Sequence, residues 1–156
     1  MSEETILENK LIVFRLGQEE YALSVQNVGS IERILPITRV PSTPSFVKGV
    51  INLRGVVTPV IDLKRRFHNE GTEFTNQTRI IIINFEDITV GIIVDSANDV
   101  VDIDESQIEP PPEVVGMVEV DYITGVVKLD NRLLILLDLE KILSKEEWSE
   151  IKAMEG

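Results

Sequence analysis

The chain of 156 residues contains no cysteine, which excludes disulfides, thiolate metal sites and cysteine nucleophiles together. Histidine occurs once, at His68, so no second imidazole exists to share a metal ion. His68 borders a polar segment, and we interpret it as a solvated loop residue rather than as part of a catalytic site. Because the sequence also has no glycine-rich phosphate loop, it predicts a protein without a cofactor.

Long apolar runs are also missing, and none approaches the roughly 20 residues that a membrane-spanning helix needs. The N-terminal segment MSEETILENK is acidic and polar, without the apolar core of a signal peptide. The formal net charge is −12, so a surface that bears phosphates would repel the chain. We therefore expect a soluble cytoplasmic protein that binds no nucleic acid and does not insert directly into a membrane.

Valine and isoleucine are abundant, with 39 residues of 156, whereas aromatic residues make up only 5%. Branched side chains pack well on a pleated surface, so the fold is predicted to be mainly β. Short apolar segments separated by turn residues indicate the strands. The predicted strands cover residues 10–17, 20–25, 28–35, 47–53, 56–63, 79–85, 88–95, 98–105, 122–129 and 132–139.

Two short helices are predicted beside the strands. Asp62 is placed to cap the free N–H groups of the first helix, which is expected to end at Phe67. Ser144 and Glu147 have the spacing of a capping box and mark a C-terminal helix. We expect this helix to pack back on the body of the protein through one apolar face.

The two halves of the chain repeat one another. Residues 49–67, GVINLRGVVTPVIDLKRRF, align without a gap with residues 125–143, GVVKLDNRLLILLDLEKIL, and five positions are identical. The front segments align as well, 11–14 with 80–83 and 21–25 with 90–94. Each copy alone is too small to bury much apolar surface, so the copies should share a core.

The repeat predicts two tandem, similar five-stranded β-barrels of the SH3-like kind that share a hydrophobic core. The polar segment 68–78 between them is interpreted as a linker. The predicted organisation is a single domain, 1–156, with a first lobe at 10–67, a second lobe at 79–143 and a C-terminal helix at 144–155.

The tip of the hairpin at residues 49–63 differs between the copies. In the first copy the tip is Arg54-Gly55, and in the second it is Asp130-Asn131. Asp and Asn are ordinary turn residues, and Gly55 supplies the positive φ that a tight turn favours. Because a turn alone does not require arginine, the asymmetry indicates an additional role for Arg54.

One enzyme signal competes with a binding role. The segment IIVDSA (92–97) has the apolar-Asp-Ser-small pattern of aspartic proteases, which need two such carboxylates. The first copy has Gln26 at the corresponding place, so a protease would have to be a dimer that uses Asp95 from each chain. A general peptide-binding β-barrel module is a further alternative, because exposed barrel edges bind extended segments.

Several long blocks in order resemble the CheW family, the coupling proteins of bacterial chemotaxis. The blocks are LIVFRLGQEEYAL (11–23), TRVPSTPSFVKGVINLRGVVTPVIDL (38–63), VGIIVDSANDV (90–100), IEPPPE (108–113), YITGV (122–126) and RLLILLDLEKIL (132–143). The resemblance implies two small five-stranded barrels and a scaffold rather than an enzyme. It implies two partners, the regulatory domain of the CheA histidine kinase and the cytoplasmic tip of methyl-accepting chemoreceptors, and recruitment to membrane-associated receptor arrays.

The resemblance also implies a set of protein-binding residues. They are Val28, Ile31, Glu32, Phe46, Lys48, Gly49, Arg54, Gly55, Gly91 and Val100. The apolar members could instead be core residues, and Gly49 and Gly91 could serve only close backbone packing. Arg54 is expected to contact the receptor or to hold the binding groove through an ion pair, for which Glu32 is a candidate partner.

Overall fold

The computed structural model describes residues 10–110 and 122–154, and within them the chain forms two β-sheets. Part of the three-proline loop at 110–112 lies outside the described residues. The strands are β1 Lys10–Leu16, β2 Glu19–Ser24, β3 Val28–Arg33, β4 Val47–Leu53, β5 Val56–Asp62, β6 Arg79–Phe85, β7 Ile88–Val94, β8 Ser96–Asp102, β9 Ile108–Glu109, β10 Ile123–Leu129 and β11 Arg132–Leu137. The helices are α2 Leu63–His68 and α3 Lys145–Ala153, with 3-10 turns η1 Val25–Asn27, η2 Glu105–Gln107 and η4 Leu139–Lys141.

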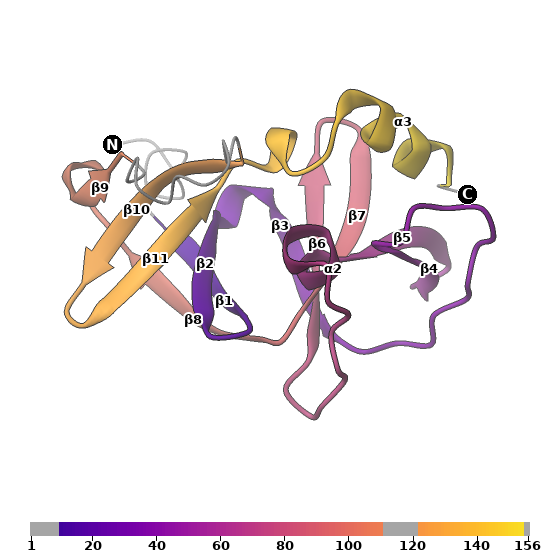
Figure 1. Ribbon diagram of the computed structural model, residues 1–156, viewed down its shortest axis with the longest axis horizontal. Helices are drawn as coiled ribbons and strands as arrows, with labels where there is room; N and C mark the ends of the chain where they lie inside the picture. Colours follow the sequence, from indigo (N-terminus) through magenta and orange to yellow (C-terminus); the bar gives the residue numbers. More distant parts are fainter. Residues whose placement is uncertain (1–9, 111–121, 155–156) are drawn as a thin grey trace.

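The two sheets lie side by side along the long axis of the molecule (Figure 1). Sheet A has the order β8-β1-β2-β11-β10-β9, and sheet B has the order β3-β6-β7-β5-β4. The predicted fold class, mainly β with two similar units of about five strands, is confirmed. Within the described part of the chain, no helix combines the length and apolar character that a membrane span requires.

The sheets do not coincide with the predicted lobes 10–67 and 79–143, because the two halves exchange their first hairpins. The β1–β2 hairpin lies in sheet A with strands of the second half, and β6–β7 lies in sheet B with strands of the first half. Strands β1 and β6 are apolar on both faces, as LIVF and IIII show. A central position with both faces covered suits such strands, and the exchange provides it.

The internal repeat is present in the strand register as well as in the sequence. In the parallel pair β5–β7, Val60 lies opposite Gly91. In the parallel pair β11–β2, Leu136 lies opposite Ala22. These are corresponding positions of the sequence alignment, so the repeat predicted from sequence relates the two sheets residue by residue.

The predicted shared core is present. One cluster of buried residues joins β1 and β2 of sheet A to β5, β6 and β7 of sheet B, and it includes Phe14, Leu23, Ile81 and Ile92. Each sheet also has a smaller cluster of its own, with Val13 in sheet A and Ile82 in sheet B at corresponding positions. Burial on both faces of β1 and β6 therefore ties the two sheets into one unit.

Helix α3 packs on sheet B as expected from its apolar face. Ser144 and Glu147 form the predicted capping box, and Trp148 and Ile151 are buried. Trp148 packs against Phe85 at the end of β6, with ring centroids 5.1 Å apart. The helix thereby completes the shared core at one side.

The segment 69–78 is fixed to the body of the protein, so its interpretation as a plain linker was incomplete. The fully buried Asp62 caps α2 by accepting the N–H of Arg65. Asp62 also accepts the N–H of Thr72 at 2.8 Å and the hydroxyl of Thr72 at 2.7 Å. One buried carboxylate therefore holds both the helix and the segment that follows it.

Candidate protein-binding site

The β4–β5 turn presents Arg54 in an unusual backbone conformation. Arg54 has φ +50° and Gly55 has φ +86°, so both central residues have the positive φ of a type I′ hairpin turn. The amide oxygen of Asn52 accepts the N–H of Gly55 at 2.7 Å. A left-handed conformation costs a residue other than glycine about 1 kcal/mol, and Asp130, at the corresponding tip, belongs to a type that tolerates it better. An arginine kept in this conformation indicates a role for its side chain.

The Arg54 side chain joins the two edges of sheet B. Its Nη2 lies 3.0 Å from Oε2 of Glu32. Glu32 belongs to β3 and Arg54 follows β4, and these two strands are the opposite edges of the sheet. Hydrogen bonds from Ser30 and Arg54 hold the pKa of the Glu32 carboxyl below its usual value. The ion pair considered for Arg54 is therefore present, and it spans the seam where the sheet closes on itself.

Arg54 nevertheless remains accessible. Its side chain is 69% exposed, whereas that of Glu32 is 20% exposed. The guanidinium thus has donors left for a partner while the carboxylate orients it. Val56 and Val57, the next residues after the turn, are also exposed, and neither was predicted from the sequence as a binding residue. Their apolar sequence is typical of a buried strand. Only their position next to the turn indicates that the first residues of β5 are exposed.

Ile31 and Val100 occupy corresponding edges of the two sheets. Ile31 on β3 pairs with Ile81, and Val100 on β8 pairs with Ile12. Both partners belong to the shared core, so Ile31 and Val100 lie on the faces of their strands that point toward the boundary between the sheets. Ile31 is 38% exposed and Val100 is 55% exposed.

Val28 lies on the same edge strand as Ile31 and is half-buried against the shared core. We call Val28, Ile31 and Val100 the inter-sheet strip. Exposed apolar side chains at the margin of a packed core are typical of a surface that another protein covers.

Three predicted binding residues serve the fold instead. Phe46 is only 5% exposed, and the guanidinium of Arg66 lies over its ring, 5.4 Å from the centroid. A Cβ on Gly49, which has φ +147°, would lie 2.1 Å from the carbonyl oxygen of Thr38. A Cβ on Gly91 would lie within 3 Å of two core side chains. These positions are inside the protein, where no partner reaches them directly.

Lys48 is intermediate in exposure between the buried and the exposed residues of the predicted set. It is half-buried, and its Nζ is 6.0 Å from the centroid of the exposed Phe74 ring. Phe74 belongs to the segment that Thr72 fixes to the buried Asp62. Lys48 therefore remains available to a partner, beside Phe74, which was not among the binding residues predicted from the sequence.

The carboxylate of Asp95 has a structural role. It accepts the N–H of Gly17 at 2.6 Å and lies 3.5 Å from Nζ of Lys64. A dyad of the aspartic-protease type would need this carboxylate free to share a proton with a second one. Among the described residues, no group of three or more His, Asp or Glu side chains could hold a metal ion.

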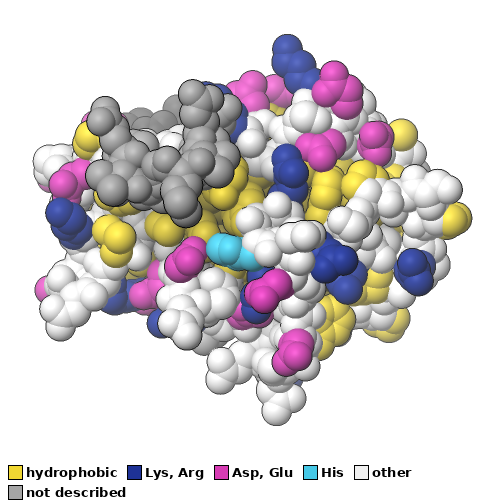
Figure 2. Space-filling model, viewed as in Figure 1, with side chains coloured by type: hydrophobic (Ala, Val, Ile, Leu, Met, Phe, Trp, Pro, Cys, Tyr) yellow, Lys and Arg dark blue, Asp and Glu magenta, His cyan; other side chains and the backbone are white. Residues whose placement is uncertain are grey.

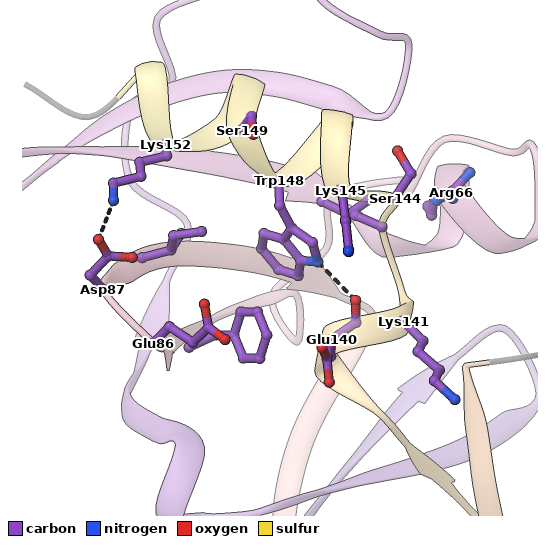
Figure 3. A pocket seen from close by; sticks show the side chains of 13 residues that line it. Arg66, Glu86, Asp87, Glu140, Lys141, Ser144, Lys145, Trp148, Ser149 and Lys152 are labelled. Atoms are coloured by element: carbon purple, nitrogen blue, oxygen red, sulfur yellow. Dashed lines mark hydrogen bonds and ion pairs between the residues drawn. The ribbon is translucent and has the colours of Figure 1, made fainter.

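A separate pocket of about 860 Å³ lies beside helix α3 (Figure 3). Two contacts join residues that line the pocket. Lys152 forms an ion pair with Asp87, and Trp148 Nε1 donates a hydrogen bond of 3.0 Å to the carbonyl oxygen of Glu140. Both contacts hold α3 against the rest of the molecule. We interpret the pocket as a consequence of this packing rather than as the binding site.

Exposed apolar side chains form no single broad patch on the face shown in Figure 2. On the face shown in Figure 2, hydrophobic patches alternate with acidic and basic groups. The candidate site consists of an ion-paired arginine at a turn and exposed apolar side chains at strand edges. Fold and site together define a β-rich module that works by binding other proteins.

The comparisons with known proteins identify the family. A family model described as CheW-like domain matches residues 10–147. The chemotaxis protein CheW of Bacillus subtilis (strain 168) is 49% identical over 146 residues, 94% of this chain and 94% of that protein. The chemotaxis protein CheW of Klebsiella aerogenes is 42% identical over 140 residues, 90% of this chain and 84% of that protein. The scaffolding protein TtCheW from Thermoanaerobacter tengcongensis aligns with a TM-score of 0.81 at 35% identity, covering 94% of this chain and 95% of that one.

The chain therefore belongs to the CheW family, the coupling adaptors of chemotaxis. This membership favours neither the dimeric protease nor the general peptide-binding module.

Proposed function

We propose that this chain couples the cytoplasmic tip of methyl-accepting chemoreceptors to the regulatory domain of the CheA kinase. The observation that carries the proposal is the Arg54–Glu32 ion pair, an exposed arginine fixed across the seam of sheet B in a member of the CheW family. The chain acts as a scaffold in the cytoplasm, is recruited to membrane-associated receptor arrays, and carries out no covalent step itself.

The inter-sheet strip is the proposed receptor surface. Val28, Ile31 and Val100 offer apolar contacts from edge strands of both sheets. One helix of the receptor tip would place an apolar face against them, which is the helix-in-groove mode of recognition. Gly91 supports sheet B from within, because the side chains of Val60 and Ile80 on the neighbouring strands fill the space over it.

The β4–β5 turn is the proposed kinase surface. Arg54, Gly55, Val56 and Val57 lie at or beside this turn, and Lys48, at the opposite end of β4, is proposed to extend the contact. Phe46 and Gly49 fix the path of β4 from inside, since Gly49 allows the bridge between Thr38 and Val50. Glu32 contributes by orienting the Arg54 guanidinium.

In this proposal, coupling changes the relative populations of the active and inactive states of the kinase. The receptor state changes how well the bridged kinase fits its active or inactive arrangement, and the chain transmits this difference as a rigid connector. Each contact is small and weak by itself, and an array gains strength because many contacts form together.

The test is kinase autophosphorylation in a mixture of CheA, receptor signalling fragments and this chain. Wild-type chain should raise the activity only when receptor is present, and Arg54→Ala should lose most of that increase while it stays folded. Lys145→Ala is the matched control, because Lys145 is an exposed cation on α3 and lies outside both proposed surfaces. If wild-type chain binds neither partner at high micromolar concentration, the proposal fails.

A further inference from the structure

Two arginines face each other directly on neighbouring strands. In the antiparallel pair β3–β6, Arg33 lies opposite Arg79. Side chains at paired positions of a sheet project from the same face, with Cβ atoms roughly 4.5–5.5 Å apart. Like charges at such positions destabilise a sheet, so this pair has a cost for the free protein.

No acidic side chain of the described residues compensates the two charges. Arg33 is exposed and has neither an ion pair nor a hydrogen bond within the described part of the chain. Arg79 uses its Nη1 for the carbonyl oxygens of Asn76 and Thr78, at 2.9 and 2.8 Å. Its Nε and Nη2 remain available. The chain carries 27 acidic residues against 15 basic ones, so an uncompensated pair of arginines stands out against the overall charge.

The two arginines line one surface hollow. Its volume is about 510 Å³, and its walls are formed by Arg33, Ile34, Thr75, Asn76, Thr78 and Arg79. The lining contains two guanidinium groups, hydroxyls and an amide, but no carboxylate. Such a set of donors suits a carboxylate, which accepts the bidentate hydrogen bonds that a guanidinium offers.

The hollow continues the proposed receptor surface. Arg33 lies two residues after Ile31 on β3, and alternate residues of a strand share a face. Arg79 lies two residues before Ile81, on the same face of β6. A partner segment that covers Ile31 with an apolar side chain would bring its next residues over the two arginines.

We propose that Arg33 and Arg79 together bind an Asp or Glu side chain of the receptor tip, on the segment that packs along β3. The inference rests on the proposed function, because it assigns a charge contact to the partner that covers Ile31. Binding of the carboxylate relieves the repulsion between the arginines, and this relief adds to the affinity. The contact makes partner recognition dependent on salt.

The experiment compares the full wild-type chain with Arg33→Glu and Lys145→Glu, which change the net charge equally. Affinities for the receptor signalling fragment and for the CheA regulatory domain are measured at low and high salt, together with thermal unfolding of each free variant. We expect Arg33→Glu to weaken binding to the receptor signalling fragment about 10-fold or more at low salt and to reduce the salt dependence of that binding, while the affinity for the CheA regulatory domain stays unchanged. We expect Lys145→Glu to bind like wild type.

The same variant should unfold at a higher temperature. Arg33→Glu places an opposite charge across from Arg79, so the melting temperature of the free chain should rise by about 1–4 °C. Weaker binding together with higher stability cannot result from damage to the fold. A charge reversal of the contacted Asp or Glu in the partner should restore binding to Arg33→Glu.

Three results would overturn the inference. Equal affinities of Arg33→Glu and Lys145→Glu for the receptor fragment would contradict the inference while leaving the proposed function intact. Failure of wild-type chain to bind either partner would remove the proposed function and the inference together. If Arg33→Glu abolished binding to phosphatidylglycerol vesicles but left both partner affinities unchanged, the occupant would be an anionic headgroup and not a protein carboxylate.

Discussion

The buried carboxylate of Asp62 binds Thr72 twice, through the main-chain N–H and through the side-chain hydroxyl. Ten residues separate the two, and helix α2 lies between them. This contact turns the polar segment after the helix into a fixed part of the structure. It also supports the position of Phe74, which packs near Lys48.

Replacing Thr72 tests how much this contact stabilises the fold. Thr72→Val removes the hydroxyl that donates to Asp62 and leaves a buried carboxylate oxygen with fewer partners. We expect the free energy of unfolding to fall by about 1.5–3 kcal/mol, measured by urea denaturation. Thr124→Val is the control, because that threonine is exposed and its hydroxyl makes only a 3.4 Å contact. Equal losses for both variants would contradict a special role for the Asp62–Thr72 contact.

The substitution Arg54→Gly distinguishes the role of the turn conformation from the role of the arginine side chain. Glycine adopts the positive φ of this position freely, and the exposed ion pair with Glu32 contributes little to stability. The free energy of unfolding should therefore stay within about 1 kcal/mol of wild type. Receptor-dependent kinase activation should nevertheless be lost. Full activation by this variant would show that the turn needs its shape and not its arginine.

Gly49 is expected to tolerate no side chain. In Gly49→Ala the new Cβ would meet the carbonyl oxygen of Thr38 at 2.1 Å, so the backbone must move. We expect a loss of about 3 kcal/mol or more in the free energy of unfolding. Gly17→Ala is the matched control, since Gly17 also has positive φ but has open space around it. That control should lose only about 1 kcal/mol, and urea denaturation of both variants distinguishes packing from backbone conformation.

The ion-paired carboxyl of Glu20 should make stability depend on pH. The hydrogen bonds from Arg132, 3.2 and 2.7 Å long, hold the pKa of Glu20 below its ordinary value of 4.5. A lowered pKa in the folded state means a contribution that is complete above about pH 4.5 and is lost as the pH falls through the folded pKa. The difference in unfolding free energy between wild type and Glu20→Gln should shrink over that range. Glu70→Gln, an exposed carboxyl without an ion pair in the described residues, should show no comparable change.

Local patterns in the sequence predicted most elements of the fold. Alternating and continuous apolar segments located the strands, and the capping residues Asp62 and Ser144 located both helices. The alignment of residues 49–67 with 125–143 predicted the repeat, which the register of Val60 and Leu136 reproduces. These features depend on neighbours in the chain, so a single sequence contains them.

The exchange of hairpins could not be predicted in the same way. Strands β1 and β6 have nearly the same apolar pattern, and either would fit the centre of either sheet. The choice depends on the path of the connections and on contacts between residues far apart in the chain. The burial of Phe46 could not be predicted either, because the sequence does not show whether an apolar residue before a strand is buried or exposed.

The two copies differ in where their charged contacts lie. In the second copy Arg132, at the position of Val56, contacts both Glu20 and Asp99. In the first copy the charged contact involves Arg54 at the turn itself, and Val56 is exposed. Sequence alone identified the difference at the turn tip, whereas the three-residue contact around Arg132 depends on the folded arrangement.

The exchange of hairpins has a consequence for how such a chain could arise. Each sheet consists of the opening hairpin of one half and the later strands of the other. Two identical intertwined subunits joined end to end would have this connectivity. Two separate identical subunits would carry the same residue at both turns, whereas one continuous chain can carry Arg54 at one turn and Asp130 at the other.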